Sequence, residues 1–238
     1  MRDIIIHEVR PESKQQINAL LSLFTKIFPE YHRYALQIQK SIERGQMLNP
    51  KILPHHWLIE YNENFVGFTL FNYLMNGNFG FGRYIGVDPN FGSNGIGFEI
   101  IKNIVKQVGE DAKRFEQPPP LGFCTEVESP EQANSTDEIY LRRMRLDYFL
   151  KKCKAIELDV NYLEPQVISG QMQVSPKRDF EVPMHLLLFT DDSIPGLSVE
   201  ETAIIVEKIY LDHYMLEPDS ELIRNVLDSI GQATQMYV

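Results

Sequence analysis

The sequence predicts an α/β fold, and three features support this class. Segments with apolar residues at helical spacing are separated along the chain by short runs in which apolar and polar residues alternate, as in strands. Two of these runs flank a turn and predict a hairpin, and a third leads through a glycine loop into a long helix. The 238 residues are 43% hydrophobic and 24% charged, which fits one or at most two globular domains with a sizeable core.

The N-terminal part is predicted to form one strand and two helices. Ile4 to Val9 has the apolar character of a strand, and the turn after it leads into a helix that ends at Pro29. A second helix is expected from about Tyr31 to Gly45, and Pro50 and Pro54 indicate a loop after it. Four apolar residues form the stripe of the first helix: Leu20, Leu21, Phe24 and Phe28.

Two strands and a turn follow. Trp57 to Tyr61 and Phe65 to Met75 flank residues 62–64 and predict a hairpin, and Phe79 to Val87 predicts the next strand. Strict alternation would place Phe79, Phe81, Arg83, Ile85 and Val87 on one face, and Gly80, Gly82, Tyr84 and Gly86 on the other. A row of glycines indicates close approach either of a ligand or of another part of the protein.

The stretch from Tyr84 to Val108 reads as strand, glycine loop and helix. Asp88-Pro89 ends the strand, and Ser93 or Asn94 is in position to cap the helix. The first N–H groups of such a helix favour an anion, and glycine lets phosphate oxygens approach the backbone. The loop glycines are Gly92, Gly95 and Gly97, and the helix stripe is Ile100, Ile101, Ile104, Val105 and Val108.

Spacing separates three glycine motifs that could explain this loop. The dinucleotide fingerprint needs a third small residue where Ile100 stands, and the mononucleotide loop needs a lysine that is missing. The third motif is V-x-P-x-x-Q/R-x-x-G-x-G/A, and Val87, Pro89, Gly95 and Gly97 match it in register. The stretch therefore resembles the coenzyme A pyrophosphate loop of the GNAT N-acetyltransferases. Gly92 stands where that family has Gln or Arg.

The resemblance covers roughly Ile4 to Thr190 and implies a mixed, mostly antiparallel sheet flanked by helices. It also implies that acetyl-CoA is the co-substrate, that no metal is needed, and that the strand before the loop binds the pantetheine arm through its backbone. We expect residues 1–190 to form the acyl-CoA-binding domain and residues 191–238 a helical extension packed on it. The residues that the resemblance assigns to acetyl-CoA are Ile85, Gly86, Val87, Phe91, Gly92, Ser93, Asn94, Gly95, Ile96 and Gly97.

Candidate catalytic residues lie on the strand predicted at Leu121 to Val127. Alternation puts Cys124, Glu126 and Glu128 on one face, so either glutamate could accept the proton of an amine. Cys124 is interpreted as a small core residue. In the resembling family a tyrosine at the end of the next helix protonates the thiolate, and Tyr148 is the candidate here, although the glycine of the family's Tyr-x-x-x-Gly stretch is missing.

The rest of the chain is predicted to add helices and two strands. Ser135-x-x-Glu138 and Ser198-x-x-Glu201 are capping boxes, and the second C-terminal helix is expected from about Asp219 to Ile230. The first of these helices should run to about Lys152, with Leu141, Met144 and Tyr148 on one stripe. The last two strands are Ile156 to Val160 and Met184 to Thr190. The long connection between them is either a border of the acceptor site or an excursion.

Charge and cysteine content limit the function. The net charge of −10 argues against nucleic acid or an anionic membrane as a partner. The N-terminal apolar run is too short for a signal peptide, and Cys124 and Cys153 form no metal or redox motif, so a cytoplasmic location is expected.

The resulting prediction is a GNAT-type N-acetyltransferase that transfers acetyl from acetyl-CoA to a primary amine of a small molecule or peptide. Two alternatives remain open: a non-catalytic coenzyme-A-binding module, and a related N-acyl synthase that uses a longer acyl donor. The sequence does not identify the acceptor or the oligomeric state, and a homodimer is one possible state.

Overall fold

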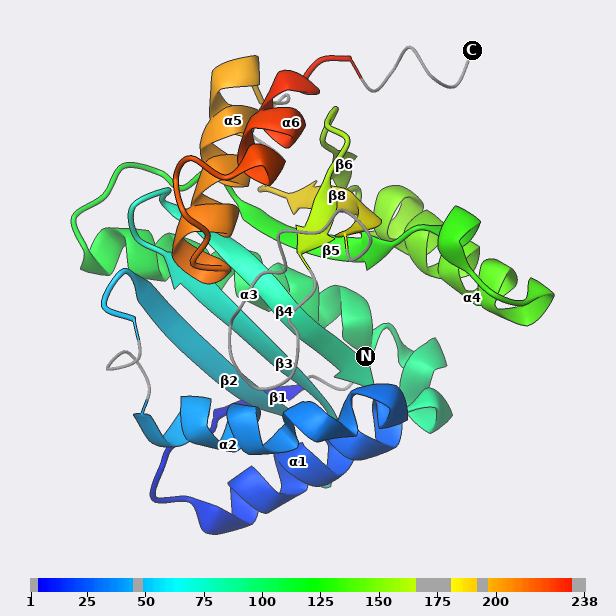
Figure 1. Ribbon diagram of the computed structural model, residues 1–238. Coiled ribbons are helices and arrows are strands. Elements are labelled where there is room, and N and C mark those ends of the chain that lie inside the picture. The colour runs from blue at the N-terminus through cyan, green and yellow to red at the C-terminus, as the bar shows by residue number, and fades with distance from the viewer. Residues whose placement is uncertain (1–3, 45–48, 166–180, 192–196, 233–238) are drawn as a thin grey trace.

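A computed structural model of the protein describes residues 4–44, 49–165, 181–191 and 197–232. Its centre is an eight-stranded sheet with the order β1-β2-β3-β4-β5-β8-β6, and β7 pairs with β8 beside this path (Figure 1). All neighbouring strands are antiparallel except β4 and β5, which run parallel. The expected mixed, mostly antiparallel sheet with flanking helices is confirmed.

Most element bounds lie near the predicted ones, but β2 begins at Ile52 instead of Trp57, and the strand predicted from Ile156 to Val160 is limited to Ile156–Glu157. The strands are β1 (Ile5–Glu8), β2 (Ile52–Tyr61), β3 (Asn64–Leu74), β4 (Phe79–Val87), β5 (Phe123–Glu128), β6 (Ile156–Glu157), β7 (Leu163–Pro165) and β8 (Glu181–Phe189). The α-helices are α1 (Lys14–Ile27), α2 (Ala35–Arg44), α3 (Ile96–Arg114), α4 (Thr136–Asp147), α5 (Val199–Lys208) and α6 (Glu221–Asp228). Short 3₁₀ and π turns complete them: η1 (Pro29–Tyr34), η3 (Pro89–Asn94), η4 (Pro130–Gln132), η5 (Tyr148–Lys152) and η7 (Ile209–His213).

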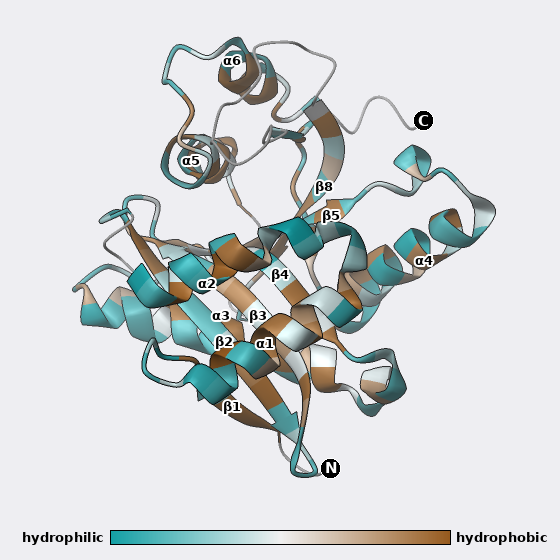
Figure 2. Cartoon of the chain, turned by 60° about the horizontal axis from the view of Figure 1, so that its bottom comes forward, coloured by the Kyte–Doolittle hydropathy of each residue, from teal (hydrophilic) through white to brown (hydrophobic). Residues whose placement is uncertain are grey.

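Helices lie on both faces of the sheet, and the strands between them are largely apolar, as their brown colour in Figure 2 shows. We call the face under α1, α2, α5 and α6 the front face and the face under α3 the rear face. Leu70 and Phe81 lie in front-face clusters, whereas Phe71 and Phe123 lie in the rear-face cluster. Within the described residues, no helix is long and apolar enough to cross a membrane.

A bulge in β4 corrects the predicted alternation. Leu70 pairs with Tyr84 and Phe71 pairs with Gly82, so Arg83 is left without a strand partner. A bulge of this kind adds one residue to a strand and inverts the face of those that follow. Phe81 therefore packs in a front-face cluster, whereas Ile85 packs against the rear-face cluster, and the two do not share a face.

The glycines of β4 serve close packing. A Cβ at Gly80 would lie 2.4 Å from a methyl carbon of Val108 on α3, and one at Gly82 would lie 2.7 Å from the ring of Phe123. A side chain at Gly80 would push α3 away from the sheet, and one at Gly82 would displace the ring of Phe123. Of the two interpretations, packing by another part of the protein accounts for both glycines.

Two other expectations about local structure are wrong. Pro54 lies inside β2, paired with Asn72, and not in a loop. β1 pairs only with the later part of β2, from Trp57 onward, so Pro54 lies at the edge of the sheet. A proline is tolerated there because no neighbouring strand needs a hydrogen bond from its backbone nitrogen. The second helix begins at Ala35, because the preceding residues from Pro29 form a 3₁₀ turn.

The helices after β5 differ in how they pack. The Ser198 capping box is present in both directions, and α5 and α6 bury Ile205, Val206 and Ile223 against the front face. α4 begins at the Ser135 cap but has no buried residue, and Leu141 and Met144 of its predicted stripe are more than half exposed. Figure 1 shows α4 extending away from the sheet.

Candidate active site

The glycine loop forms a helix start without a side-chain cap. β4 ends at Val87, the 3₁₀ turn η3 follows, and Gly95 adopts a left-handed conformation with φ of 74° before α3 begins. Gly95 itself is the N-cap, so the expected capping by Asn94 is wrong, and the side chain of Ser93, the other candidate, lies outside the part of the chain that the structure describes. Glycine tolerates this backbone conformation, and the uncapped amides leave the positive end of the α3 dipole available to an anion.

The loop is anchored at its entrance and open along its course. Asp88 accepts hydrogen bonds from Lys26 on α1, at 2.5 Å, and from the amide of Asn90. These two donors hold the pKa of Asp88 below its usual range. A Cβ at Gly92 or Gly95 would meet no atom within 4 Å. The space above the loop therefore fits a phosphate group close to the backbone.

Beside the loop, β4 and β5 separate. Their pairing is limited to Gly80–Phe123, Phe81–Cys124 and Gly82–Thr125. Beyond these pairs the two parallel strands diverge (Figure 1), although β4 keeps its pairing with β3 as far as Val87. The backbone from Arg83 to Val87 thus faces an opening between strands, which can accept an extended ligand by main-chain hydrogen bonds.

Glu126 is the first residue of β5 beyond the paired segment, and it lies on the front face with Cys124. Tyr162 Oη donates to Glu126 Oε1 at 2.5 Å, and Tyr214 Oη lies 2.9 Å from both carboxyl oxygens. Burial raises the pKa of Glu126 well above its usual range; the nearby Glu164 raises it further, and the two tyrosine hydroxyls oppose the shift. A carboxyl group with a raised pKa is suited to proton transfer near neutral pH.

Glu128 has a different environment. Its carboxylate lies 2.9 Å from Arg145 and 3.6 Å from Arg142, both on α4, and Arg142 also pairs with Glu138. Two guanidinium groups therefore engage Glu128, whereas hydroxyl groups surround Glu126. The structure separates two glutamates that the sequence could not rank.

Tyr148 begins the π turn η5 and lies at the other end of the opening. Its hydroxyl lies next to the first turn of α3, at Gly97. Burial and Cys153 raise the pKa of Tyr148 to about 12. Within the described residues, no hydrogen bond joins Tyr148 to Glu126 or Glu128. The three candidate catalytic residues are therefore not one connected group.

Cys124 is buried in the front-face cluster, where desolvation raises the pKa of its thiol. It is a core residue, as expected. The described residues hold no group of three or more His, Cys, Asp or Glu side chains that could bind a metal ion.

The family comparison agrees with this geometry. Residues 17–116, which include strands β2 to β4, the glycine loop and α3, match the model of the acetyltransferase (GNAT) family. This segment, which is less than half of the chain, is therefore similar to the GNAT family. None of the functionally curated proteins matches the sequence.

Solved GNAT structures share the fold across most of the chain. A protein from Bacteroides thetaiotaomicron assigned to the GNAT family has 14% identity and a TM-score of 0.60, and the match covers 90% of this chain and 99% of that one. An aminoglycoside 6'-N-acetyltransferase, solved with coenzyme A, has 14% identity and a TM-score of 0.52, over 81% and 99% of the two chains. A tandem GNAT protein from the clavulanic acid biosynthesis pathway has 14% identity and a TM-score of 0.50, over 67% and 46%.

On the front face of this GNAT fold, aromatic and acidic residues gather near the opening. The rings of Tyr31 and Tyr84 lie 6.1 Å apart, and Tyr84 comes from β4 just beyond the bulge. Burial raises the pKa of Tyr31, and the carboxylates of Glu128 and Glu164 raise it further. Tyr31 therefore lies in a largely desolvated environment on the same face as these two glutamates.

Three residues of the candidate site were not expected from the sequence: Tyr162, Glu164 and Tyr214. Tyr162 and Glu164 lie in the connection that was expected either to border the acceptor site or to be an excursion. Tyr214 follows η7 in the C-terminal segment, where no sequence pattern indicates a catalytic role. No motif marks any of them, because each is brought to Glu126 by tertiary packing.

Proposed function

We propose that this protein is an acetyl-CoA-dependent N-acetyltransferase that acetylates a primary amine. One observation carries the proposal: two groups suited to the reaction lie at the opening between β4 and β5. The start of α3, without a side-chain cap, follows β4, and the buried carboxyl group of Glu126 belongs to β5. The family match supports the same activity.

The chain's residues supply binding and proton transfer. The amides of the loop from Phe91 to Gly97 face the pyrophosphate of the coenzyme, and the free backbone of Ile85, Gly86 and Val87 faces its pantetheine arm. Bound acetyl-CoA supplies the thioester carbonyl carbon that the amine attacks. The C–N bond forms, the C–S bond breaks, and the products are an acetamide and the free thiol of coenzyme A.

Glu126 is the proposed general base. A lysine-like amine has a pKa of about 10.4, so freeing its lone pair at pH 7 costs about 4.6 kcal/mol. The raised pKa of Glu126 lets the carboxylate take this proton near neutral pH. Tyr148 remains the proposed acid for the thiolate, and its contact with the start of α3 also supports a role in holding the coenzyme.

Release of free thiol from acetyl-CoA, measured with a panel of amines, tests the proposal. Glu126→Gln should lower kcat/KM by about 10²- to 10⁴-fold at pH 7, and the loss should shrink as the pH approaches the pKa of the amine. Glu128→Gln is the matched control, because it changes the neighbouring carboxylate on the same strand face, and it should keep kcat/KM within a few-fold.

Other outcomes select other functions. Coenzyme A binding by calorimetry without amine-dependent thiol release would indicate a non-catalytic module. Faster turnover with longer acyl thioesters would indicate an N-acyl synthase. Equal losses in the two glutamine variants would refute the assignment of the base.

A further inference from the structure

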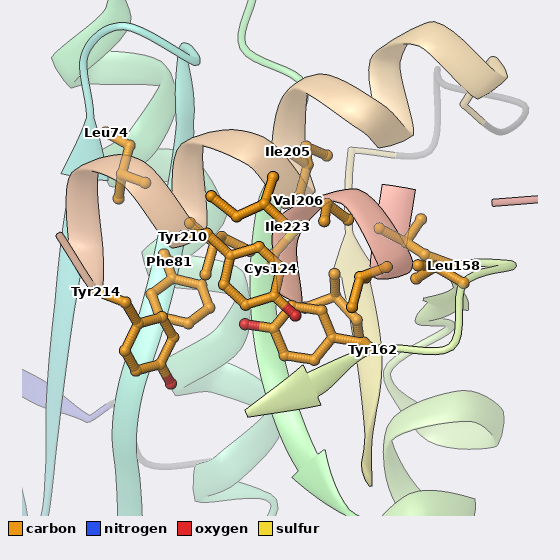
Figure 3. Packing of buried hydrophobic residues seen from close by; sticks show 14 of the residues in the cluster. Leu74, Phe81, Cys124, Leu158, Tyr162, Ile205, Val206, Tyr210, Tyr214 and Ile223 are labelled. Carbon is orange, nitrogen blue, oxygen red and sulfur yellow. The ribbon is translucent and has the colours of Figure 1, made fainter. Parts of the chain in front are cut away.

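The C-terminal segment from α5 to α6 reaches the proposed base. Tyr214 follows the π turn η7, and its hydroxyl lies 2.9 Å from both oxygens of Glu126, a residue 88 positions earlier in the chain. Figure 3 shows Tyr162, Tyr210 and Tyr214 among the buried residues beneath the C-terminal helices. A π turn is a rare element that is found frequently at functional sites.

Other contacts hold these hydroxyl groups in place. The ring of Tyr162 stacks on Tyr210 of η7, with centroids 5.3 Å apart and planes 7° from parallel. Tyr210 Oη donates to the carbonyl oxygen of Leu163 at 2.7 Å, which fixes the backbone next to Tyr162. The tyrosines therefore have little freedom to turn away from Glu126.

A second set of bonds anchors η7 to the central hairpin. Asp212 is buried, with its carboxylate 3.1 Å from Lys51 Nζ and 3.2 Å from Asn76 Nδ2. Lys51 precedes β2 and Asn76 follows β3. These bonds hold η7, and with it Tyr214, against the sheet that carries Glu126.

The two oxygens of Glu126 are not equivalent. Oε1 accepts from both Tyr162 and Tyr214, whereas Oε2 has only the Tyr214 contact within the described residues. A hydroxyl donor stabilises a carboxylate more than a carboxylic acid, so the tyrosines favour the ionised form that accepts a proton. They also leave Oε2 as the oxygen with free acceptor capacity.

We propose that Tyr162 and Tyr214 are positioning residues for Glu126: their hydroxyl groups favour the ionised form of its carboxyl group and orient Oε2 to take the acceptor's proton. The C-terminal segment is then part of the active site. This inference rests on the proposed role of Glu126 as the base.

The other ionisable groups around this carboxyl group come from three elements. Glu164 on β7 opposes ionisation of Glu126 and also acts on Tyr214. Tyr210 comes from η7, and Arg83 at the β4 bulge interacts electrostatically with Tyr214. All of these groups remain in the variants described next, so a change in titration reports the removed hydroxyl.

The test replaces one hydroxyl at a time and follows the titration of Glu126. In Tyr214→Phe and Tyr162→Phe, the acid limb of the kcat/KM profile should move to higher pH by about one unit or more, because a hydrogen bond to a charged group is lost. Activity should recover at high pH. A merely structural defect would lower kcat/KM at every pH without moving the limb.

A control and a second measurement complete the design. Tyr73→Phe removes a buried hydroxyl that donates to Asn78 on the rear-face side of the sheet and has no contact with Tyr162, Tyr214 or Glu126, so its acid limb should stay in place. Carbon-13 NMR of the Glu126 carboxyl carbon, assigned by its absence in Glu126→Gln, measures the same shift without any turnover. If the NMR titration shifts but no amine is acetylated, the positioning holds and the proposed function fails. If the titration is the same in wild type, Tyr162→Phe and Tyr214→Phe, the inference is wrong.

Discussion

The hydroxyl of Tyr148 lies beside Gly97, where a Cβ atom would approach it to 3.4 Å. This contact joins η5 to the first turn of α3, the part of the loop proposed to face the pyrophosphate. Any side chain at Gly97 would have to share the space with Tyr148 and with a bound phosphate.

The first prediction follows from this crowding. Gly97→Val should weaken coenzyme A binding at least about tenfold, because its branched carbons enter the space over the helix start. Gly109→Ala is the control on the same helix, since a Cβ there meets no atom within 4 Å. It should leave affinity unchanged and raise stability by about 0.8–1 kcal/mol. Calorimetric titration and thermal unfolding measure both effects, and an unaltered affinity in Gly97→Val would contradict the proposed loop contact.

The second prediction concerns the position where the family has Gln or Arg. Gly92 has open space around it and no left-handed backbone, so a long side chain fits without strain. Gly92→Arg should tighten coenzyme A binding by up to about 1.5–3 kcal/mol if the guanidinium reaches phosphate. Gly92→Ala should leave the dissociation constant unchanged, which isolates the effect of the charge. A weaker complex with Gly92→Arg would show that phosphate lies away from this side of the loop.

Local pattern predicted the elements around the loop well. The bounds of β4 agree with the prediction, because alternation and flanking turns are both strong there. The helix α3 follows its apolar stripe, and Ile100, Ile104 and Val108 are fully buried. These features depend on neighbours in sequence, which a single sequence displays.

Features that depend on partners far along the chain were not predictable. The bulge at Arg83 exists only relative to the register of β3, and Pro54 is tolerated only because β1 ends before it. Tyr214 and Glu126 are brought together by the docking of η7 and α5 on the front face. The order of the elements does not encode these pairings, so the site could be predicted at its glycine loop and not at its base.

A buried ionic network between β1, β2 and α3 gives the last prediction. His55 Nε2 lies 2.9 Å from Asp111 and its Nδ1 lies 3.1 Å from Glu8. Burial disfavours the charged imidazole, but the hydrogen bonds to Asp111 and Glu8 prevail and raise the pKa of His55 to about 9. Its folded pKa exceeds its ordinary value of about 6.5. The stabilisation is therefore fully present below about pH 6.5 and is lost as the pH rises through about 9.

Asp111→Asn should remove most of this stabilisation. At pH 6 it should lower the free energy of unfolding by about 3 kcal/mol, because the imidazolium loses a buried partner, and at pH 10 by clearly less. Glu110→Gln is the matched control: Glu110 belongs to an exposed pair with Lys106 on the same helix, and its loss should cost less than about 1 kcal/mol at any pH. Urea unfolding at pH 6, 7.5 and 10 measures these differences. An equal loss at pH 6 and pH 10 in Asp111→Asn would mean that His55 is neutral in the folded protein and that Asp111 acts only through neutral hydrogen bonds.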